Sequence, residues 1–351
     1  MEQYRINQKA GMEIGLYSLG DHIANPLTGK RISAQQRLNE LIEAAKLAEQ
    51  AGIDVFGVGE SHQTHFTTQA HTVVLGALAQ ATNKIKLAST ATVLSVSDPV
   101  RVYEDFATID LLSDGRAEII AGRGSRVGAY QLLGVNLQDY EDIFEEKLAL
   151  LQQINDEERV TWQGEYRAPL DNAEILPQPK EGKLPIWRAV GGPPASAIKA
   201  GYMGIPMILT TLGGPAMNFR QSVKAYHVAL ENSGFDPATM PIGTTSLFFV
   251  ADTTKEALQG MYPHLDYGFK AIQGQGYPRQ QFAQAPDYRD ALMVGSTEQI
   301  IEKLLYQHEL FGMQRFLAQI DFGGVPFDKI MKNIELIGEK IIPAIKKHTK
   351  Q

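Results

Sequence analysis

The chain has 351 residues, of which 44% are hydrophobic, and it carries a formal net charge of −7. Acidic and basic residues are interspersed without a basic face, which argues against nucleic acid as a partner. The sequence contains no cysteine, which excludes disulfides, thiolate metal sites and a cysteine nucleophile and fits a cytoplasmic location. It also shows no apolar signal segment at its start and no run of about 18 apolar residues that would predict a membrane span.

Short apolar strands alternate with helical patterns along most of the chain. The expected strands are 12–18, 54–59, 85–93, 116–121, 185–190, 206–209, 242–251 and 315–320. Helical spacing of apolar residues predicts the helices between them, with Ser33 as a cap and Pro99 in a first turn. The expected helices are 34–51, 68–81, 99–112, 140–155, 194–202, 215–234, 297–311 and 327–345, with a further one near Lys255.

This alternation predicts the fold class. Strand–helix–strand units imply parallel strands joined by right-handed crossovers, and eight such units close into a (β/α)8 barrel. An open doubly wound sheet is the competing architecture, but no G-x-G-x-x-G motif follows the first strand. We find no internal repeat and no low-complexity linker, so we expect residues 1–351 to form a single TIM-barrel domain.

Three segments fall outside the repeating pattern. We expect residues 1–11 to be a short, loosely held tail, and residues 161–184 to be irregular and rich in proline. Residues 260–294 are low in regular pattern and rich in Gly, Gln, Tyr and Pro. We interpret this last segment as an excursion from the core before the last βα unit, which forms either a lid over the site or a dimer-contact or surface insertion.

The active site of a (β/α)8 barrel lies at the carboxyl ends of its strands. That rule collects polar and glycine residues that follow the predicted strands. They are Ser18, Glu60, Ser61, His62, His65, residues 90–95, Arg123, Ser125, Gly191, Gly192, Ser196, Thr210, Thr211 and residues 322–324.

Two of these groups predict an anion site. Arg123 lies in the turn Gly-Arg-Gly-Ser after the fourth strand, and the planar guanidinium suits a phosphate because it makes two parallel hydrogen bonds. The turn Gly191-Gly192 opens a helix, whose first-turn N–H groups and dipole attract negative charge. The alternative interpretation is a structural ion pair of Arg123, with glycines that serve only a tight turn.

The histidines after the second strand allow more than one interpretation. His62 and His65 are three residues apart in a loop that also holds Glu60, and such ligands suit zinc. The loop lacks the helical register of a zinc protease motif and shows no obvious third ligand. A general base or an orienting hydrogen-bond donor is the preferred role. The alternative is a neutral, hydrogen-bonded histidine that lines the barrel mouth.

Three runs carry a resemblance to a known family: residues 89–104 with Asp-Pro-Val-Arg, residues 111–116 with Ser-Asp-Gly-Arg, and residues 121–125. Together they resemble the bacterial luciferase-like flavin monooxygenase family. The similarity continues through residues 189–192 and 204–209 to residues 321–326, and covers most of the chain from Met12 to Ile345. It implies a (β/α)8 barrel, usually dimeric, that binds FMN or the related deazaflavin F420.

The resemblance also implies roles for single residues. It places the cofactor phosphate on residues after strands four and five, which here are Arg123, Ser125, Gly191, Gly192 and Ser196. It places the isoalloxazine ring against the end of strand three, which here is Thr90, Ala91 and Thr92, with a non-prolyl cis peptide near Thr90–Ala91.

One motif departs from the family. The luciferases show Glu-His-His after strand two, whereas this chain has Glu60-Ser61-His62. The departure puts light-emitting aldehyde oxidation in doubt and leaves His62 as the catalytic candidate near the ring.

The resemblance therefore implies a flavin-dependent monooxygenase of the two-component type. Reduced FMN would come from a separate flavin reductase, and O₂ would be used to oxidise a small organic substrate. The first alternative is an F420-dependent oxidoreductase that transfers hydride without O₂. The second is a flavin-binding protein without catalysis. The sequence does not indicate the substrate, and the homodimer is implied by the resemblance alone.

Overall fold

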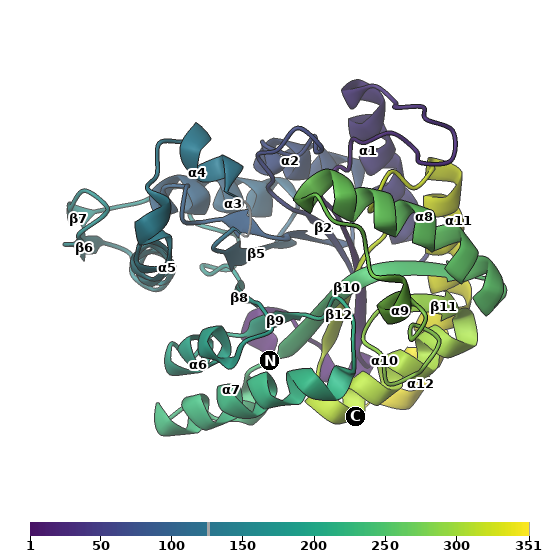
Figure 1. Cartoon of the computed structure of the whole chain (residues 1–351). Helices are drawn as coiled ribbons and strands as arrows, with labels where there is room; N and C mark the ends of the chain where they lie inside the picture. The colour runs from purple at the N-terminus through teal and green to yellow at the C-terminus, as the bar shows by residue number, and fades with distance from the viewer. Residues whose placement is uncertain (125–126, 351) are drawn as a thin grey trace.

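The computed structural model describes residues 1–124 and 127–350 (Figure 1). Within them, eight parallel strands form a closed barrel. They are β1 (Glu13–Ser18), β2 (Val55–Val58), β3 (Lys86–Ser89), β5 (Ala117–Gly122), β8 (Ile186–Val190), β9 (Met207–Thr210), β10 (Ile242–Ala251) and β12 (Arg315–Gln319). Strand β12 pairs with both β1 and β10, and β10 pairs with β9, which closes the ring. The predicted (β/α)8 barrel is confirmed.

Helices surround the barrel (Figure 1). They include α1 (Ala34–Gln50), α2 (His71–Ala81), α3 (Pro99–Leu112), α4 (Gly128–Leu132), α5 (Tyr140–Asp156), α6 (Pro194–Tyr202), α7 (Arg220–Asn232), α10 (Thr297–Phe311), α11 (Phe327–Leu336) and α12 (Ile342–Thr349). The caps follow the sequence: the Ser33 side chain accepts from Gln36 N at 3.0 Å, and Asp98 accepts from Val100 N at 2.9 Å.

Two segments differ from the expected strand pattern. The expected third strand is divided into β3 and the two-residue β4 (Thr92–Val93). The proline-rich segment contains an antiparallel hairpin of β6 (Val160–Trp162) and β7 (Leu170–Ala173), which lies at the edge of the molecule beside α5 (Figure 1). Its ladder is short because the register shifts between Val160 and Trp162. The sequence therefore shows little of the apolar–polar alternation that would have predicted these strands.

Most of residues 260–294 is regular structure, so the expected low regularity of this segment is wrong, although it does form an insertion before the last βα unit. Helix α8 (Thr254–Gln273) runs through it, followed by the short α9 (Arg279–Phe282) and strand β11 (Met293–Ser296), which pairs with the end of β10. Gly260 and Gly268 concealed α8 because glycine disfavours a helix interior. Close packing explains them: a Cβ at Gly268 would lie 2.7 Å from the Phe322 ring, and one at Gly260 would lie 3.0 Å from Phe249.

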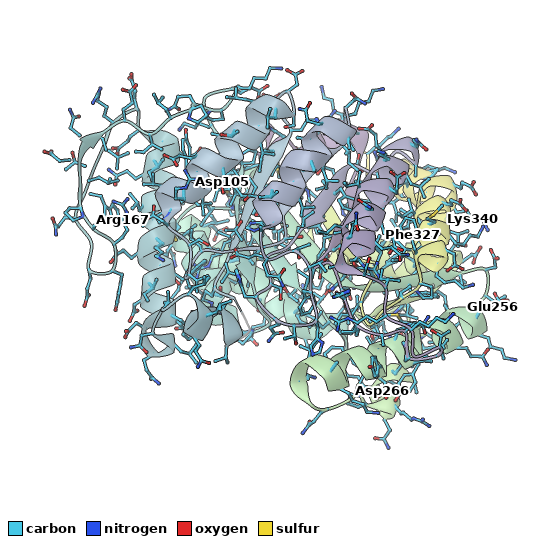
Figure 2. The ribbon with its side chains drawn as sticks, turned by 90° about the horizontal axis from the view of Figure 1, so that it is seen from above. Asp105, Arg167, Glu256, Asp266, Phe327 and Lys340 are labelled. Carbon is cyan, nitrogen blue, oxygen red and sulfur yellow. The ribbon has the colours of Figure 1, made fainter. Side chains whose placement is uncertain are left out.

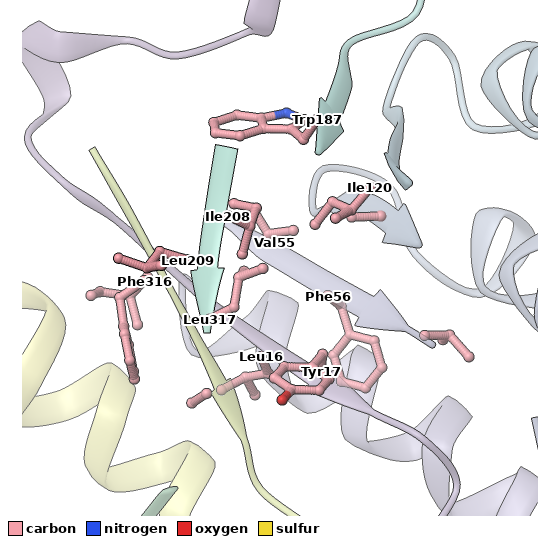
Figure 3. Close-up of a cluster of buried hydrophobic side chains, with 14 of the residues drawn as sticks. Leu16, Tyr17, Val55, Phe56, Ile120, Trp187, Ile208, Leu209, Phe316 and Leu317 are labelled. Atoms are coloured by element: carbon pink, nitrogen blue, oxygen red, sulfur yellow. The ribbon is translucent and has the colours of Figure 1, made fainter. Parts of the chain in front are cut away.

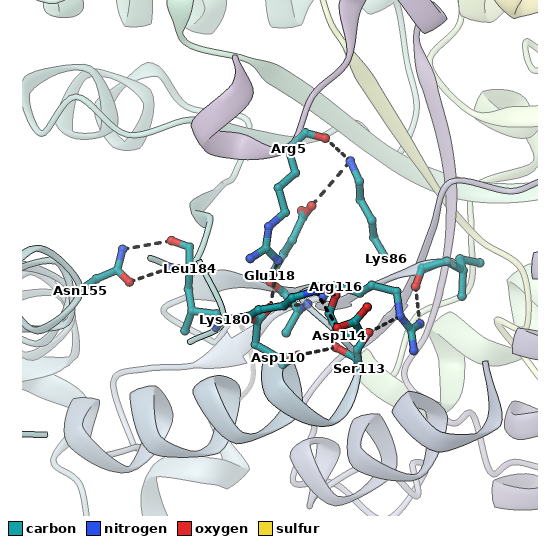
Figure 4. A network of polar contacts seen from close by, with 12 residues as sticks. Arg5, Lys86, Asp110, Ser113, Asp114, Arg116, Glu118, Asn155, Lys180 and Leu184 are labelled. Atoms are coloured by element: carbon teal, nitrogen blue, oxygen red, sulfur yellow. Dashed lines mark hydrogen bonds and ion pairs between the residues drawn. The ribbon is translucent and has the colours of Figure 1, made fainter. Parts of the chain in front are cut away.

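The first eleven residues are not a loose tail. Tyr4 and Ile6 are buried in the hydrophobic core, and the Tyr4 ring lies 6.2 Å from that of Trp187. Arg5 donates to Asp110 Oδ1 at 3.0 Å and to the Ala117 carbonyl at 2.7 Å (Figure 4). The sequence concealed this because Tyr4 and Ile6 are isolated apolar residues without a period.

The interior of the barrel is layered. Near the amino ends of the strands lie three buried charged residues, Glu13, Glu118 and Arg315, together with the half-buried Lys86. Above them is an apolar layer that includes Ile120, Ile208 and Leu317, whose side chains gather between the strands in Figure 3. Since side chains alternate along a strand, Leu317 and Gln319 follow Arg315 on the same inward face. The outer faces of the strands pack against the helices, so both faces are buried.

Charged side chains such as those of Asp105, Glu256 and Lys340 lie on the surrounding helices (Figure 2). In the described ranges, no helix combines the length and the apolar content that a bilayer crossing requires.

Candidate active site

A cavity of about 560 Å³ opens at the carboxyl ends of the strands. Residues from every barrel strand or from the loop after it contribute to its wall. They include Tyr17, Glu60, Ser61, His62, Thr90, Ala91, Val93, Ile120, Gly122, Arg123, Gly124, Tyr140, Ala189, Gly191, Ile208, Thr210, Leu212, Thr245, Leu317 and Gln319. The cavity therefore lies where the fold predicts an active site.

Strand pairing places the two predicted anion-binding turns side by side. Strand β5 pairs with β8 in the register Ala121 to Arg188, so the turns that follow the two strands are neighbours. Arg123 and Gly191 both line the cavity. A Cβ added to Gly191 would meet only Pro193 Cδ, at 4.0 Å, so its backbone borders open space. This edge of the cavity can accept a phosphate.

Arg123 is held by residues of α5. Its guanidinium lies 2.5 Å from the Glu141 carboxylate and 5.8 Å from the centre of the Tyr140 ring. The Tyr130 hydroxyl donates to the Arg123 carbonyl, which fixes the backbone beneath the side chain. The Arg123 side chain remains 28% exposed, so an anion in the cavity can reach it. Ser125, predicted to share this phosphate, lies outside the described residues.

The start of α6 offers fewer N–H donors than the sequence suggested. Positions 193 and 194 are prolines, which have no N–H group, so the dipole and the later N–H groups remain. Gly192 does not line the cavity, and its carbonyl accepts from Ser222 Oγ at 2.7 Å. Ser196 is buried, and its Oγ accepts from Arg188 Nε at 3.3 Å. The phosphate roles of Gly192 and Ser196 stay predictions.

Glu60 and His62 form a hydrogen-bonded pair in the cavity wall. His62 Nε2 lies 2.6 Å from Glu60 Oε1, and Glu60 Oε2 accepts from Val93 N at 2.7 Å. A carboxylate acceptor places the proton on Nε2, which makes Nδ1 of a neutral imidazole the acceptor. Among the described residues, His62 Nδ1 has no hydrogen-bonding partner. His62 can therefore accept or donate a proton at Nδ1 while Glu60 orients the ring.

The end of strand three has the predicted backbone. The peptide bond Thr90–Ala91 is cis, and both residues line the cavity. The Ala91 carbonyl accepts from Glu60 N at 3.0 Å, which ties this segment to the Glu60–His62 pair. Gly57 leaves room for Thr90, because a Cβ there would lie 2.4 Å from Thr90 Cγ2.

Thr92, the third predicted ring contact, faces another residue. Its Oγ1 lies 2.8 Å from His71 Nε2 in the buried interior, and Thr92 does not line the cavity. Burial lowers the pKa of the His71 imidazole, and the charge of Glu60 partly offsets this decrease. The pair therefore supports the wall from behind, and a direct ring contact for Thr92 stays a prediction.

The structure separates the two loop histidines. His62 lines the cavity, whereas His65 does not. The described ranges contain no group of three or more His, Cys, Asp or Glu side chains arranged to hold a metal ion. The geometry favours the acid–base interpretation of His62.

Tyr17, Thr245 and Gln319 are among the cavity residues that the sequence analysis did not predict. Alternation along the strands carried the signal, because Arg315, Leu317 and Gln319 share the inward face of β12. Ser18, the predicted site residue and the last residue of β1, points the other way, and its Oγ donates to Asp321 on the outer side. Within a strand, side-chain parity decides which residue enters the cavity.

The segment that carries α8 and α9 contacts the cavity wall through Tyr277, which lies between the two helices. The Tyr277 hydroxyl donates to the carbonyl of Leu212, a wall residue, at 3.4 Å. Tyr277 packs against Phe269 and Phe282, with ring centres 5.3 Å and 6.4 Å away. These contacts support the loop after β9, and a lid role stays a prediction.

The cavity fits a ring-bearing cofactor with a phosphate. The guanidinium of Arg123 and the open backbone at Gly191 supply the anion site, and the Thr90–Ala91 segment supplies a mostly apolar wall. Gly124 keeps the turn after β5 close to that wall, because a Cβ there would lie 2.6 Å from Val93 Cγ1. A phosphate-bearing flavin or deazaflavin has both features.

Comparison with known proteins agrees with this geometry. The sequence model of the luciferase-like monooxygenase family matches residues 12–314. Protein y4vJ of Sinorhizobium fredii is 23% identical over 336 residues, which cover 91% of this chain and 95% of that protein. An F420-dependent glucose-6-phosphate dehydrogenase of Kineococcus radiotolerans is 28% identical over 215 residues, which cover 59% of this chain and 63% of that enzyme.

Solved structures share the fold over nearly the whole chain. Monooxygenase RslO1 from Streptomyces bottropensis superposes with a TM-score of 0.82 at 20% identity, covering 95% of this chain and 99% of that one. The oxygenating constituent of 3,6-diketocamphane monooxygenase from Pseudomonas putida, solved in complex with FMN, gives 0.76 with the same identity and coverage. Because the family match spans most of the chain, the protein belongs to the luciferase-like monooxygenase family and is an oxidoreductase.

Proposed function

We propose that the protein is an FMN-dependent monooxygenase that oxidises a small organic substrate with O₂. The observation that carries the proposal is one cavity with an anion site at Arg123 and Gly191 and an acid–base pair at Glu60 and His62. The FMN complex of the 3,6-diketocamphane enzyme, which has the same fold, supports the choice of cofactor.

The chain's own residues would supply binding, orientation and proton transfer. Arg123 would hold the phosphate, and the Thr90–Ala91 segment would lie against the ring. Reduced FMN, when bound, supplies the two electrons with which one oxygen atom enters the substrate and the other leaves as water. His62 would move a proton at Nδ1, held in place by Glu60 through Nε2.

The first test is a titration with oxidised and photoreduced FMN, followed by flavin absorbance and fluorescence. We expect tighter binding of the reduced form. Arg123→Ala should weaken binding about 10- to 100-fold, because charge-assisted hydrogen bonds to a phosphate are lost. The control is Arg159→Ala, which removes an exposed ion pair with Glu174 on the β6–β7 hairpin. Equal FMN affinity of the two variants would contradict the anion site.

F420 is the second candidate, supported by the resemblance to the Kineococcus radiotolerans enzyme. Both cofactors present a ring and a phosphate, so binding alone does not separate them. Oxygen consumption during turnover does, because hydride transfer to or from F420 proceeds without O₂. Turnover with F420 under anaerobic conditions, together with no binding of FMN, would replace the main proposal.

We also propose that a separate flavin reductase supplies reduced FMN. The proposal predicts that NADH or NADPH alone does not reduce FMN bound to the purified chain, and that adding a flavin reductase does. Direct reduction by either nucleotide, seen as bleaching of flavin absorbance, would contradict it.

A homodimer is the proposed assembly. Val73 on α2 and Leu111 and Leu112 on α3 are exposed apolar residues on neighbouring helices, which is consistent with an interface. Light scattering should give twice the mass of one chain, and Val73→Asp should shift it toward the monomer. A monomer mass for the unmodified protein would contradict the assembly.

A further inference from the structure

A second histidine lies behind the Glu60–His62 pair of the cavity wall. Nδ1 of His71, the first residue of α2, lies 3.8 Å from Glu60 Oε2, whereas His62 Nε2 lies 2.6 Å from Glu60 Oε1. The two imidazoles therefore flank one carboxylate, each beside a different oxygen. His62 lines the cavity and His71 does not, so His71 can act on the site only through Glu60.

The Glu60 carboxylate is buried, and few groups balance its charge. Its side chain is only 5% exposed, and besides His62 it accepts from Val93 N at 2.7 Å. Among the described residues, its ion-pairing neighbours are the two histidines, and no lysine or arginine is one of them. Because a buried charge is costly unless it is paired and hydrogen-bonded, a further donor beside Oε2 stabilises the ionised form of Glu60.

The neighbours of His71 determine which of its nitrogens carries the proton. Nε2 lies 2.8 Å from Thr92 Oγ1, a hydroxyl that can donate or accept, whereas the Glu60 carboxylate can only accept. Neutral His71 therefore suits both neighbours with its proton on Nδ1, toward Glu60, and with Nε2 accepting from Thr92. At 3.8 Å the Nδ1–H group attracts the carboxylate charge without forming a hydrogen bond.

The elements packed around His71 keep its ring neutral and in place. The ring is buried, and its centre lies 6.2 Å from that of Phe106 on α3. Burial lowers the pKa of His71, the charge of His62 lowers it further, and the charges of Glu60 and Asp105 partly offset this decrease. The positive end of the α2 dipole also disfavours a second proton there. His71 is therefore a fixed, neutral donor.

The charge of Glu60 decides which nitrogen of His62 carries the proton. An ionised Glu60 can only accept, so His62 holds its proton on Nε2 and presents the Nδ1 lone pair. A protonated Glu60 would donate to Nε2, which would move the His62 proton to Nδ1 and remove the acceptor. Whatever keeps Glu60 ionised therefore keeps His62 able to accept a proton at Nδ1.

We propose that His71 is a positioning residue of this site, which holds Glu60 as a carboxylate and thereby fixes the tautomer of His62. The use of that tautomer in proton transfer rests on the proposed function. The tautomer itself is a property of the chain and can be measured without a cofactor or a substrate.

The test uses two substitutions that each retain one side of the His71 ring. The shorter amide of His71→Asn can place its N–H group near Nδ1, beside Glu60, whereas the longer amide of His71→Gln reaches the position of Nε2, beside Thr92. The His62 tautomer is read from the ring-nitrogen chemical shifts of the full chain, labelled with ¹⁵N-histidine at pH 7 and assigned with His62→Gln. We expect the Nε2–H form to dominate in wild type and in His71→Asn. In His71→Gln, the ratio of the Nδ1–H to the Nε2–H form should rise about fivefold.

His264→Gln is the matched control. His264 is also a buried histidine whose pKa is lowered by burial, but it lies on α8, outside the cavity, with Nδ1 3.0 Å from the Gly323 carbonyl. The control should leave the His62 tautomer unchanged. His71→Gln should keep the FMN dissociation constant within twofold of wild type. It should also lower turnover, but no further in a His62→Ala background, because both changes act on the same proton.

Three results would overturn the inference. One is an unchanged His62 tautomer in His71→Gln. Another is an equal change in His71→Asn or in His264→Gln, which would assign the effect to lost packing and not to the donor at Nδ1. The third is a further loss of turnover when His71→Gln is added to His62→Ala. Failure of the proposed function gives a different result: wild-type protein would not bind FMN, whereas His71→Gln would still change the tautomer of His62.

Discussion

The two ends of the barrel interior differ in whether their buried polar groups have partners within the protein. We call the end near the amino ends of the strands the closed end, and the cavity end the open end. At the closed end, Arg315 lies 2.7 Å from Glu13 and 2.5 Å from Glu118, and Lys86 lies 2.5 Å from Glu13. Every carboxylate oxygen of the two glutamates has a cationic partner. At the open end, near the carboxyl ends of the strands, Gln319 Nε2 has no hydrogen-bond partner among the described residues.

The same strands build both ends, so position along a strand separates the two roles. Arg315 and Gln319 are four residues apart on β12 and face the same interior. Burial raises the pKa of the Glu118 carboxyl, but the charges of Arg315 and Lys86 outweigh it and hold the pKa below its usual range. The polar groups of the closed end are thus satisfied within the protein, whereas the open end leaves Gln319 Nε2 without a partner among the described residues.

The largest expected effect comes from breaking the closed end. Arg315→Met would leave the two buried carboxylates with Lys86 as their remaining ion-pair partner among the described residues. It would also remove the guanidinium 4.7 Å from the Trp187 ring centre. We expect a loss of about 3–5 kcal/mol in the free energy of unfolding, measured by urea denaturation.

The control for Arg315→Met is Arg101→Met, which removes an exposed ion pair with Glu104 on α3. It should cost less than about 1 kcal/mol. A similar loss in both variants would show that the closed-end network stabilises the fold no more than a surface pair does.

Lys303 is a buried cation that donates to backbone carbonyls and not to a carboxylate, unlike Arg315 at the closed end. Its ammonium is fully buried and donates to the carbonyls of Asp290 and Leu292 at 3.0 Å and 2.8 Å. Burial lowers the pKa of Lys303 from 10.5 to about 8, which the Asp290 charge partly opposes. Between these values the unfolded chain holds a proton that the folded chain has released, so stability rises with pH.

The measurement compares wild type with Lys303→Met by urea denaturation from pH 7 to pH 10. The free energy of unfolding of wild type should rise relative to the variant by about 2–3 kcal/mol over this range. Below pH 7 the difference should be constant. A constant difference up to pH 10 would mean that Lys303 keeps an ordinary pKa in the folded protein.

At the open end, substitution should affect chemistry and not stability. We expect His62→Ala to lower turnover about 100-fold through loss of the proton-transfer group, with the FMN dissociation constant within threefold of wild type. His65→Ala is the control, because His65 lies in the same loop but does not line the cavity. Equal turnover in the two variants would remove the catalytic role of His62.

The sequence allowed the fold to be predicted because its signals were periodic. Strand β10 and helix α10 have the bounds expected from their patterns, since each buries one continuous set of apolar residues. Helix α8 was missed because Gly260 and Gly268 are selected by close packing against distant residues, which local helix propensity does not register. Burial of Tyr4 likewise depends on Trp187, 183 positions away in the sequence.

The sequence allowed those site residues to be predicted that lie in the loops directly after the strands. Arg123, Gly191 and His62 are loop residues of this kind, and the structure places all three in one cavity. Tyr17 and Gln319 face the cavity because side chains alternate along their strands, and position after a strand does not reveal that alternation. The contact of Glu141 with Arg123 could not be predicted, because it depends on how close α5 lies to the turn after β5. No local sequence pattern encodes that distance.

Glu141 supplies the smallest expected effect, and its sign is informative. The carboxylate lies 2.5 Å from the Arg123 guanidinium and is 48% exposed, so a bound phosphate must compete with it for the same cation. Glu141→Gln removes the competing charge. We expect FMN to bind about two- to fivefold more tightly, in line with the small free energy of an exposed ion pair, and the gain to shrink at high salt.

Glu174→Gln is the control for Glu141→Gln, because it removes the same charge from the remote pair with Arg159. Weaker FMN binding in Glu141→Gln alone would mean that Glu141 orients Arg123 for the phosphate and does not compete with it. The open end would then hold a preformed ion pair, as the closed end does, and the contrast between the two ends would rest on Gln319 alone. Tighter binding would extend the contrast to the anion site: the partner of Arg123 would be exchanged for a ligand, whereas the partners of Arg315 are permanent.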